Sequence, residues 1–344
     1  IINGLPQENL EIKRWKTAIL VHLNGENKNY TIGYRTDIDG LPVEEKTGLP
    51  FSSKHEGRMH ACGHDIHITV ALGVLSYFAS HRPKYNMTFI FQPAEENASG
   101  GMKLYQSGEL DEWMPDEIYA LHDNPQLPAG TIGCRKGTLF AGTCEIHVKF
   151  IGKSGHAAYP HQANDMVVAG AQFVNQIQTI VSRNVDPIQS GVVTLGHFSA
   201  GTTGNVISGV CQIDGTIRAL TQENNLLIQK RVRTIAEGIA HSFDCELEID
   251  LHQGGYYPVE NDDNTTEAFI NYEDDVDFVE TLPAMTGEDF GYLISKIPGT
   301  MFWLGVDSPY SLHSEYLAPK EESIMLGVNA ITGYLKNRQE SLNK

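Results

Sequence analysis

The sequence lacks the features that mark membrane and nucleic-acid-binding proteins. No apolar run approaches the roughly 18 residues of a membrane-spanning helix, and no secretory apolar segment is found. Basic residues are few: 25 Lys and Arg stand against 43 Asp and Glu, giving a formal net charge of -18. Neutralising nucleic-acid phosphates requires an excess of positive charge. We therefore expect no membrane partner and no nucleic-acid partner.

Cysteine is also scarce, and its pattern excludes a disulfide framework. The five cysteines are odd in number, widely spread and without any C-x-x-C pair. This usage fits the reducing cytoplasm better than a secreted setting. Repeats and low-complexity segments are absent too, and 344 residues exceed what one hydrophobic core usually supports. We expect a cytoplasmic protein of two domains.

What the sequence does contain is a dense cluster of possible metal ligands at 59–67, reading M-H-A-C-G-H-D-I-H. One glycine separates Cys62 from His64, so a tight turn can aim a thiolate and an imidazole at one point. Asp65 could orient one of these ligands, while His60 and His67 stay unassigned. The alternative is a buried cysteine beside surface histidines, and the cluster alone does not decide between them.

Four strand-like runs each precede a polar residue suited to such a site. The runs and the residues that follow them are Tyr30–Tyr34 before Asp37, Met87–Phe91 before Glu95 and Glu96, Glu117–Leu121 before His122, and Thr300–Val306 before His313. Helical patterns such as Ile66–Phe78 lie between the runs, as in an α/β fold with a mostly parallel sheet and helices on both faces. Ligands of such sheets bind beyond the carboxyl ends of the strands.

The middle of the chain has a different pattern. Three segments alternate with period two and two have helical spacing: Thr143–Phe150, Gly209–Ile217 and Cys245–Leu251, then Asp165–Val181 and Glu223–Ile239. Half-buried strands with two helices predict a smaller α+β layer. We therefore divide the chain into a discontinuous metal-binding domain, 1–142 and 254–344, and an inserted domain, 143–253, that serves as a lid or for dimerisation.

Together the possible ligands are too many for one ion. A catalytic zinc keeps one position open, so five side chains suit two ions about 3.5–4 Å apart. Such a pair could hold a carbonyl oxygen and generate hydroxide near neutral pH. Zinc is favoured by this donor set, with nickel, cobalt and manganese as alternatives. The five are Cys62, His64, Glu96, His122 and His313.

Adjacent carboxylates allow one to ligate and the other to act as general base. We assign Glu96 as a metal ligand and Glu95 as the general base. The swapped roles are one alternative, and a pair of exposed loop carboxylates without a catalytic role is the other. Asp37 would accept a hydrogen bond from a ligating imidazole, or else merely cap a turn.

The inserted domain offers candidates for substrate binding. Gly152-Lys-Ser-Gly-His156 lacks the first glycine of a phosphate loop, so we reject a nucleotide site. Its glycines could present His156 to a developing oxyanion. Asn205 and Arg218 could clamp a carboxylate, although Arg218 could instead form a surface salt bridge.

These motifs resemble the M20 metallopeptidases, specifically the amidohydrolase branch that includes aminoacylases, hippurate hydrolases and bacterial deacetylases of acetylated diaminopimelate. The matching stretches are R-T-D-I-D-G-L-P (35–42), M-H-A-C-G-H-D (59–65), F-Q-P-A-E-E (91–96), A-L-H (120–122), G-K-S-G-H-A-A (152–158), M-T-G-E-D-F (285–290) and L-H-S (312–314). The resemblance implies a dinuclear catalytic domain with the five ligands above, and Glu95 as base. The N-terminal segment of the family, with the pattern R-R-x-x-H-x-x-P-E, is absent from this sequence, and the stretch 271–277 is shorter than is usual in the family. We therefore expect the natural protein to contain further residues at both places.

The resemblance implies removal of the acetyl group from N-acetyl-diaminopimelate, a step of lysine biosynthesis, to give diaminopimelate and acetate. A broader N-acyl-amino-acid hydrolase, such as an aminoacylase or hippurate hydrolase, is the alternative. A non-catalytic protein that uses metal to bind amino-acid derivatives is the alternative from another class. A homodimer through the inserted domain is left open, as is whether His156 acts within its own subunit.

Overall fold

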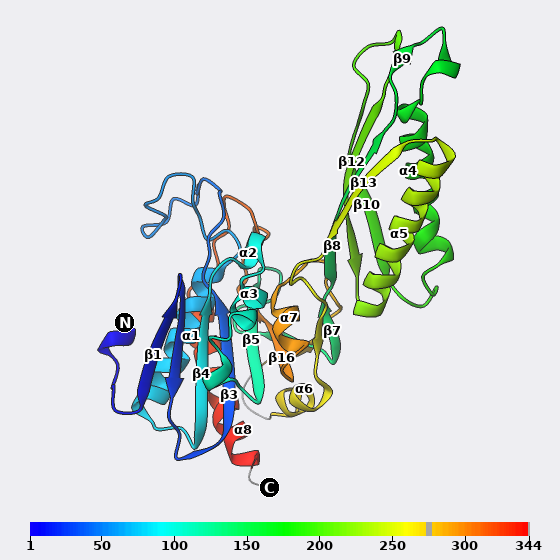
Figure 1. Cartoon of the computed structure of the whole chain (residues 1–344). Helices are drawn as coiled ribbons and strands as arrows, with labels where there is room; N and C mark the ends of the chain where they lie inside the picture. Colours follow the sequence, from blue (N-terminus) through cyan, green and yellow to red (C-terminus); the bar gives the residue numbers. More distant parts are fainter. Residues whose placement is uncertain (273–276, 343–344) are drawn as a thin grey trace. The chain divides into compact units, whose positions relative to one another are not determined.

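The computed structural model describes residues 1–272 and 277–342. Its contacts divide the chain into two compact units, shown along the chain in Figure 1. Unit 1 comprises Ile1–Leu139, Val259–Leu282 and Asp289–Lys344, and unit 2 comprises Phe140–Pro258 and Pro283–Glu288. The predicted boundaries at 143 and 253 fall inside unit 2, and the lid or dimerisation role of this unit stays a prediction. Of the stretch 271–277, residues 273–276 lie outside the described residues.

Unit 1 is built on an eight-stranded sheet of order β1-β2-β4-β3-β5-β16-β6-β15. Its strands are β1 (Leu10–Trp15), β2 (Ala18–Leu23), β3 (Asn27–Asp37), β4 (Tyr85–Gln92), β5 (Glu117–Asn124), β6 (Ile132–Cys134), β15 (Phe278–Glu280) and β16 (Gly299–Gly305). The four central strands β4, β3, β5 and β16 are parallel, whereas β1, β2 and β4 pair antiparallel. The predicted α/β class with a mostly parallel sheet is confirmed, and the hairpin β1–β2 is an addition to it.

Helices cover both faces of this sheet (Figure 1). The long helices α1 (His64–Ser80) and α8 (Glu322–Ser341) pack against each other on one face, and the short α3 (Gly100–Gln106) and α7 (Phe290–Ile294) pack together on the other. Every residue of β4 and of β16 is buried. Burial on both faces is the reason why these strands are mostly apolar and do not alternate, with Asn86, Thr88, Gln92 and Thr300 as buried polar exceptions.

Shorter elements complete unit 1. They are α2 (Glu95–Ala98), α6 (Asp263–Ile270), the 3-10 turns Ile2–Gly4 and Asp111–Trp113, and the paired strands β7 (Gly137–Phe140) and β14 (Val259–Asn261). Across the described residues, no helix combines the length and apolarity that crossing a bilayer would require.

Unit 2 is a four-stranded antiparallel sheet with two helices on one face. The strand order is β10-β12-β8-β13, with β8 (Gly142–Ile151), β10 (Gly191–Ala200), β12 (Val210–Ala219) and β13 (Glu246–His252). Burial alternates along β8 and β13, so one face packs on α4 (Met166–Arg183) and α5 (Gln222–Ser242) while the other is open. The predicted smaller α+β layer is confirmed. A further pair, β9 (Gly155–His156) with β11 (Val206–Ile207), lies at one end of this sheet (Figure 1).

Candidate metal centre

The central parallel strands of unit 1 end at one edge of the sheet, and the candidate residues gather there. Asp37 is the last residue of β3, Glu95 and Glu96 follow β4 in α2, and His122 lies near the end of β5. Cys62 and His64 come from the turn that starts α1, and His313 comes from the loop after β16. The structure thus brings all five predicted ligands into one cluster.

Potential ligand atoms in this cluster lie at distances expected around metal ions. The Sγ atom of Cys62 is 3.3 Å from Nε2 of His313 and 3.7 Å from Nε2 of His122. The Oε1 atom of Glu96 is 3.5 Å from Nε2 of His313 and 3.8 Å from Nε2 of His64. Two overlapping groups follow, one with Cys62, His64 and His122 and one with Cys62, Glu96 and His313. Cys62 belongs to both, as a bridging thiolate would.

The backbone is forced into unusual conformations where it presents these groups. Gly63, between the two candidate ligands Cys62 and His64, has φ +72, and a Cβ there would lie 2.4 Å from the Asp123 carboxylate. Ala94 and His313 are left-handed although they carry side chains, with φ of 62 and 66. Such strain concentrates at functional sites, where the surrounding structure overrides local preference.

Two of the three candidate imidazoles, those of His64 and His122, are oriented through their other ring nitrogen. His64 Nδ1 lies 3.0 Å from the carbonyl oxygen of Asp39, and His122 Nδ1 lies 2.9 Å from that of Asp123. Donation to these carbonyls leaves the Nε2 lone pairs facing the cluster. The carboxylate of Asp39 in turn accepts the backbone N–H groups of Glu95 and Glu96, at 3.2 and 3.1 Å. Asp39 therefore ties the carboxylate pair to the His64 ligand.

Asp37 has a different partner from the one predicted for it. Its Oδ1 lies 2.6 Å from Nδ1 of His67 and 3.8 Å from Nδ1 of the ligand candidate His64. Its Oδ2 accepts from Arg35 at 2.8 Å, and the same guanidinium donates to Asp289 at 2.8 Å. Asp37 thus contacts the candidate ligands through His67 and not by a direct hydrogen bond to His64.

The electrostatics of the cluster follow from burial and close charges. Burial alone would raise the pKa of Asp123, but the adjacent His122 and His67 side chains hold that pKa at about 2. Burial also opposes ionisation of Asp37, yet His64, His67 and Arg35 keep its pKa well below the ordinary value. Burial and the nearby carboxylates of Glu96 and Asp123 raise the pKa of the Cys62 thiol. A thiolate at Cys62 therefore requires a cation beside it.

A second observation also fits a bound metal ion. His64 Nε2 and Glu96 Oε1 are both buried and make no hydrogen bond in the described structure. Buried polar atoms without partners are costly, so each calls for a ligand. A donor set of one thiol, three imidazoles and a carboxylate suits zinc and its borderline neighbours.

The two adjacent glutamates occupy different surroundings. Glu96 Oε1 faces the ligand imidazoles, whereas Glu95 is buried and its Oε1 accepts the backbone N–H of Asp289 in a long hydrogen bond of 3.4 Å. This division matches the predicted roles of ligand and base, which remain a hypothesis.

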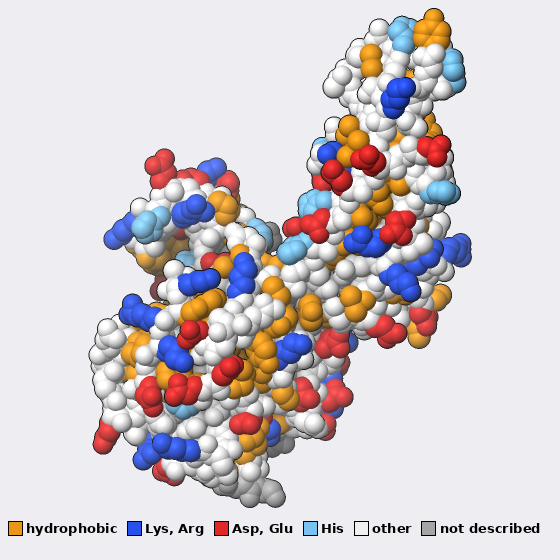
Figure 2. All heavy atoms as spheres, in the orientation of Figure 1, with side chains coloured by type: hydrophobic (Ala, Val, Ile, Leu, Met, Phe, Trp, Pro, Cys, Tyr) orange, Lys and Arg blue, Asp and Glu red, His pale blue; other side chains and the backbone are white. Residues whose placement is uncertain are grey.

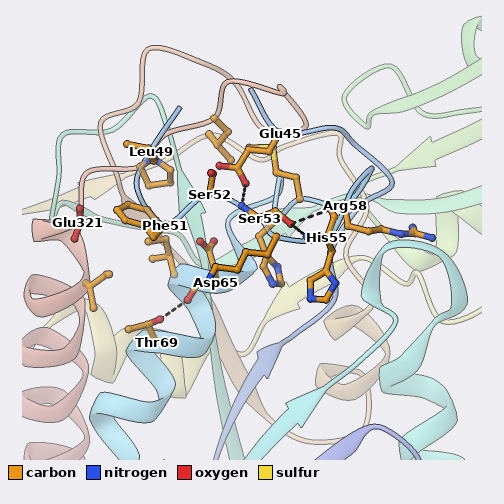
Figure 3. A pocket seen from close by; sticks show the side chains of 18 residues that line it. Glu45, Leu49, Phe51, Ser52, Ser53, His55, Arg58, Asp65, Thr69 and Glu321 are labelled. Atoms are coloured by element: carbon orange, nitrogen blue, oxygen red, sulfur yellow. Dashed lines mark hydrogen bonds between the residues drawn. The ribbon is translucent and has the colours of Figure 1, made fainter. Parts of the chain in front are cut away.

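A pocket of about 630 Å³ lies on the outer side of the first turns of α1 (Figure 3). Its wall includes Asp65 and Thr69, whose hydroxyl donates to the Asp65 carbonyl, and none of the five candidate ligands. Asp65 thus lines this pocket, and its predicted role of orienting a ligand stays a prediction.

The three candidates in unit 2 do not come together. His156 and Asn205 are neighbours at one end of the sheet, because the N–H of Ala157 donates to the Asn205 carbonyl at 3.1 Å. Arg218 lies near the far end of β12, eight residues beyond Val210. At about 3.3 Å per strand residue, Val210 and Arg218 are roughly 26 Å apart. One copy of unit 2 cannot close Asn205 and Arg218 on the same carboxylate.

Several residues of the centre were missed from the sequence, namely Arg35, Asp39, His67, Asp123 and Asp289. A signal for His67 was available, since it stands three residues after His64 and so shares a helix face with it. Asp123 directly follows the predicted ligand His122. Asp39 and Asp289 lie in the stretches 35–42 and 285–290, which match the family pattern.

Several known proteins resemble this chain in sequence and in structure. The chain is 99% identical over 347 aligned residues to the N-acetyldiaminopimelate deacetylase of Ligilactobacillus salivarius, covering 100% of this chain and 91% of that protein. It is 70% identical to the enzyme of that name from Lactiplantibacillus plantarum, with 98% and 90% covered. A solved structure of a dinuclear metal-binding M20 peptidase from Bacillus subtilis is 30% identical, with a TM-score of 0.82 over 96% of this chain and 88% of that one.

The wider family is defined by a profile that matches residues 33–337, which include every candidate of unit 1 and unit 2. The chain belongs to the Peptidase family M20/M25/M40.

Proposed function

We propose that this chain removes the acetyl group from N-acetyl-diaminopimelate, giving acetate and diaminopimelate in lysine biosynthesis. The observation that carries the chemistry is the convergence of Cys62, His64, Glu96, His122 and His313 around buried ligand atoms without hydrogen-bond partners. The substrate rests on the relatives of that name at 99% and 70% identity. The five free thiols agree with the reducing cytoplasm that we predict for the enzyme.

Two divalent ions held by these five side chains would polarise the acetyl carbonyl and lower the pKa of a water molecule. Glu95 takes a proton from the attacking water as its oxygen bonds to the carbonyl carbon. Glu95 then delivers that proton to the amide nitrogen, which leaves with the electron pair of the broken C–N bond. Its burial and its hydrogen bond from Asp289 support this role, because both restrict where its carboxylate can point.

The substrate is tested by a panel on zinc-loaded protein that compares N-acetyl-diaminopimelate with benzoyl-glycine and N-acetyl-methionine. We expect the highest kcat/KM for N-acetyl-diaminopimelate, measured as released acetate or amine. A higher value for benzoyl-glycine would favour the hippurate hydrolase alternative. Absence of turnover with every acyl amino acid, despite bound metal, would favour a binding protein.

The role of the two glutamates is tested by Glu95→Ala and Glu96→Ala. Loss of the base lowers kcat by about 10²–10⁴-fold, and we expect Glu95→Ala to keep its metal. Glu96→Ala should instead lose bound metal, as measured by elemental analysis after dialysis. Near wild-type deacetylation by folded, metal-loaded Glu95→Ala would refute the assignment.

We further infer a homodimer in which His156 and Asn205 act on the substrate of the other subunit. The support is their separation from Arg218 within one unit 2, which is far longer than an acetylated amino acid. Unit 2 also exposes several large apolar side chains that an interface could cover, and Figure 2 shows apolar side chains on its visible face. They include Val167 and Val168 on α4, Phe198 on the edge strand β10, and Val206 and Val210.

Mixing two inactive variants distinguishes action within a subunit from action across the dimer. If His156 acts across the dimer, a heterodimer of Glu95→Ala and His156→Ala contains one site with both native residues. Random mixing should then restore about a quarter of wild-type activity, because half the dimers are mixed and each has one complete site. Activity that stays at the level of the separate variants would show that His156 acts within its own subunit.

A further inference from the structure

His67 is a buried histidine of the metal centre with both ring nitrogens engaged. Its Nδ1 lies 2.6 Å from Oδ1 of Asp37, and its Nε2 lies 2.9 Å from the backbone N of Asp123 and 3.1 Å from Oδ1 of Asp123. The side chain is fully buried. A ring with Nδ1–H donating to Asp37 and Nε2 accepting from the Asp123 N–H has no lone pair left for a metal ion.

The ring also lies between two ligand candidates. Its centroid is 5.2 Å from that of His64 and 4.7 Å from that of His122, while the His64 and His122 centroids are 6.0 Å apart. A smaller side chain would leave a gap beside both imidazoles. In a close-packed interior, neighbouring rings relax into such a gap only partly, and at a cost.

The two carboxylates that His67 joins belong to different strands and to different parts of the centre. Asp37 ends β3 and is fixed by Arg35, which also holds Asp289, the residue whose N–H contacts Glu95. Asp123 lies on β5, where its carbonyl and its Oδ1, at 2.9 and 3.2 Å, both face Nδ1 of the ligand candidate His122. His67 therefore connects Asp123, which contacts His122, to Asp37. Through Arg35 and Asp289, Asp37 is in turn connected to the proposed base Glu95.

We propose that His67 is a positioning residue of the metal centre, which spaces His64 from His122 and joins Asp37 to Asp123 without binding metal itself. The inference rests on the metal centre of the proposed function but not on the identity of the substrate. Two other readings predict different behaviour. His67 could be a metal ligand, since it lies near His64 and Asp37 and near His122 and Asp123, or its role could be confined to the core.

Two substitutions separate these readings. His67→Gln keeps an amide that can donate to Asp37 and an oxygen that can accept from the Asp123 N–H. His67→Phe keeps the volume of the ring but offers neither bond. The matched control is His22→Phe, which changes another buried histidine of unit 1, on strand β2, hydrogen-bonded to Thr88 and stacked on Trp113.

The main readout is metal affinity, measured on each protein without substrate by competition with a chromophoric chelator. We expect His67→Phe to weaken the binding of at least one ion by about 10–100-fold, the usual effect of losing an outer-shell partner. His67→Gln should retain two ions and recover most of that affinity, and His22→Phe should bind like the wild type. The visible spectrum of the cobalt-loaded protein should be the same for wild type and His67→Gln, because no donor atom changes.

Three results would overturn the role of His67. Wild-type affinities in His67→Phe would show that its contacts do not position the ligands. Loss of one ion together with a changed cobalt spectrum in His67→Gln would make His67 a ligand. An equal loss in His22→Phe would trace the effect to the fold. If the wild type itself binds no metal, the metal centre of the proposed function fails, which is a different outcome from equal affinities in all variants.

Discussion

Gly63→Ala should destabilise unit 1 and loosen the metal centre together. Gly63 lies between Cys62 and His64 with φ +72, where an L side chain costs about 1–2 kcal/mol. Alanine also lowers the conformational entropy of the unfolded chain relative to glycine, and this effect offsets about 0.4–1 kcal/mol of that cost. The remaining term is steric, because the new Cβ would lie 2.4 Å from three atoms of the Asp123 carboxylate.

Asp123 cannot move aside freely, since its side chain is fully buried and its Oδ1 lies 3.1 Å from Nε2 of His67 and 3.2 Å from Nδ1 of His122. Overpacking of this kind typically costs about 1–3 kcal/mol. Gly48→Ala is the matched control: its φ of +70 gives the same backbone strain, but nothing lies within 4 Å of its added Cβ. We therefore expect Gly63→Ala to be less stable than Gly48→Ala by about 1–3 kcal/mol in the free energy of unfolding.

The measurement is urea unfolding of metal-free protein followed by tryptophan fluorescence. The three tryptophans, Trp15, Trp113 and Trp303, all belong to unit 1, so the signal reports that unit alone. Chelator competition on the same variants should show weaker metal binding for Gly63→Ala and unchanged binding for Gly48→Ala. Equal unfolding free energies in the two variants would refute the packing of Asp123 against Gly63.

Three further predictions concern other parts of the chain. Arg35→Met leaves Asp37 and Asp289 buried without their shared cation, and it should cost about 3–5 kcal/mol by the same fluorescence assay; a loss below 1 kcal/mol would contradict the charge argument. Asp165→Ala removes the side chain that accepts the N–H groups of Val167 and Val168 at the start of α4, so hydrogen exchange of α4 should show a loss of about 1 kcal/mol that Asp165→Asn avoids. Burial raises the pKa of Cys144 to about 12 and that of Cys211 to about 11, from 9.0, so folding favours the protonated thiols. Their contribution to the stability of unit 2 should be complete below about pH 9 and fall as the pH rises toward 11–12, as followed by circular dichroism; Cys144→Ala should reduce that fall.

The sequence was sufficient to predict that the candidate ligands at four strand ends lie close together, because parallel strands bring their carboxyl ends to one edge of the sheet. It did not give the direction of individual side chains. Asp37 was expected to contact a ligating imidazole, and in the structure it contacts His67, which had been left unassigned. Position along a strand was likewise harder to infer than position on a face. Period-two alternation places Arg218 on a face of its strand but does not show that Asn205 lies near the opposite end.

The hairpin β1–β2 illustrates a missing local signal. Its two-residue turn pairs Trp15 with Ala18 and places Lys16 at φ +53, a conformation usually signalled by Gly, Asn or Asp. Without such a residue, nothing in the sequence indicated a turn there. The buried neighbours on the sheet supply the reason that the turn forms, since Val21 and Leu23 of the second strand are fully covered.

The order in which the ligands occur along the chain has a consequence for synthesis in the cell. Cys62 precedes its neighbour His313 by 251 residues. At about 5–20 residues per second, a ribosome needs roughly 10–50 s to travel from one codon to the other. During that interval the nascent chain carries a thiol whose later partners do not yet exist. Assembly of the complete cluster must therefore wait until translation is nearly finished.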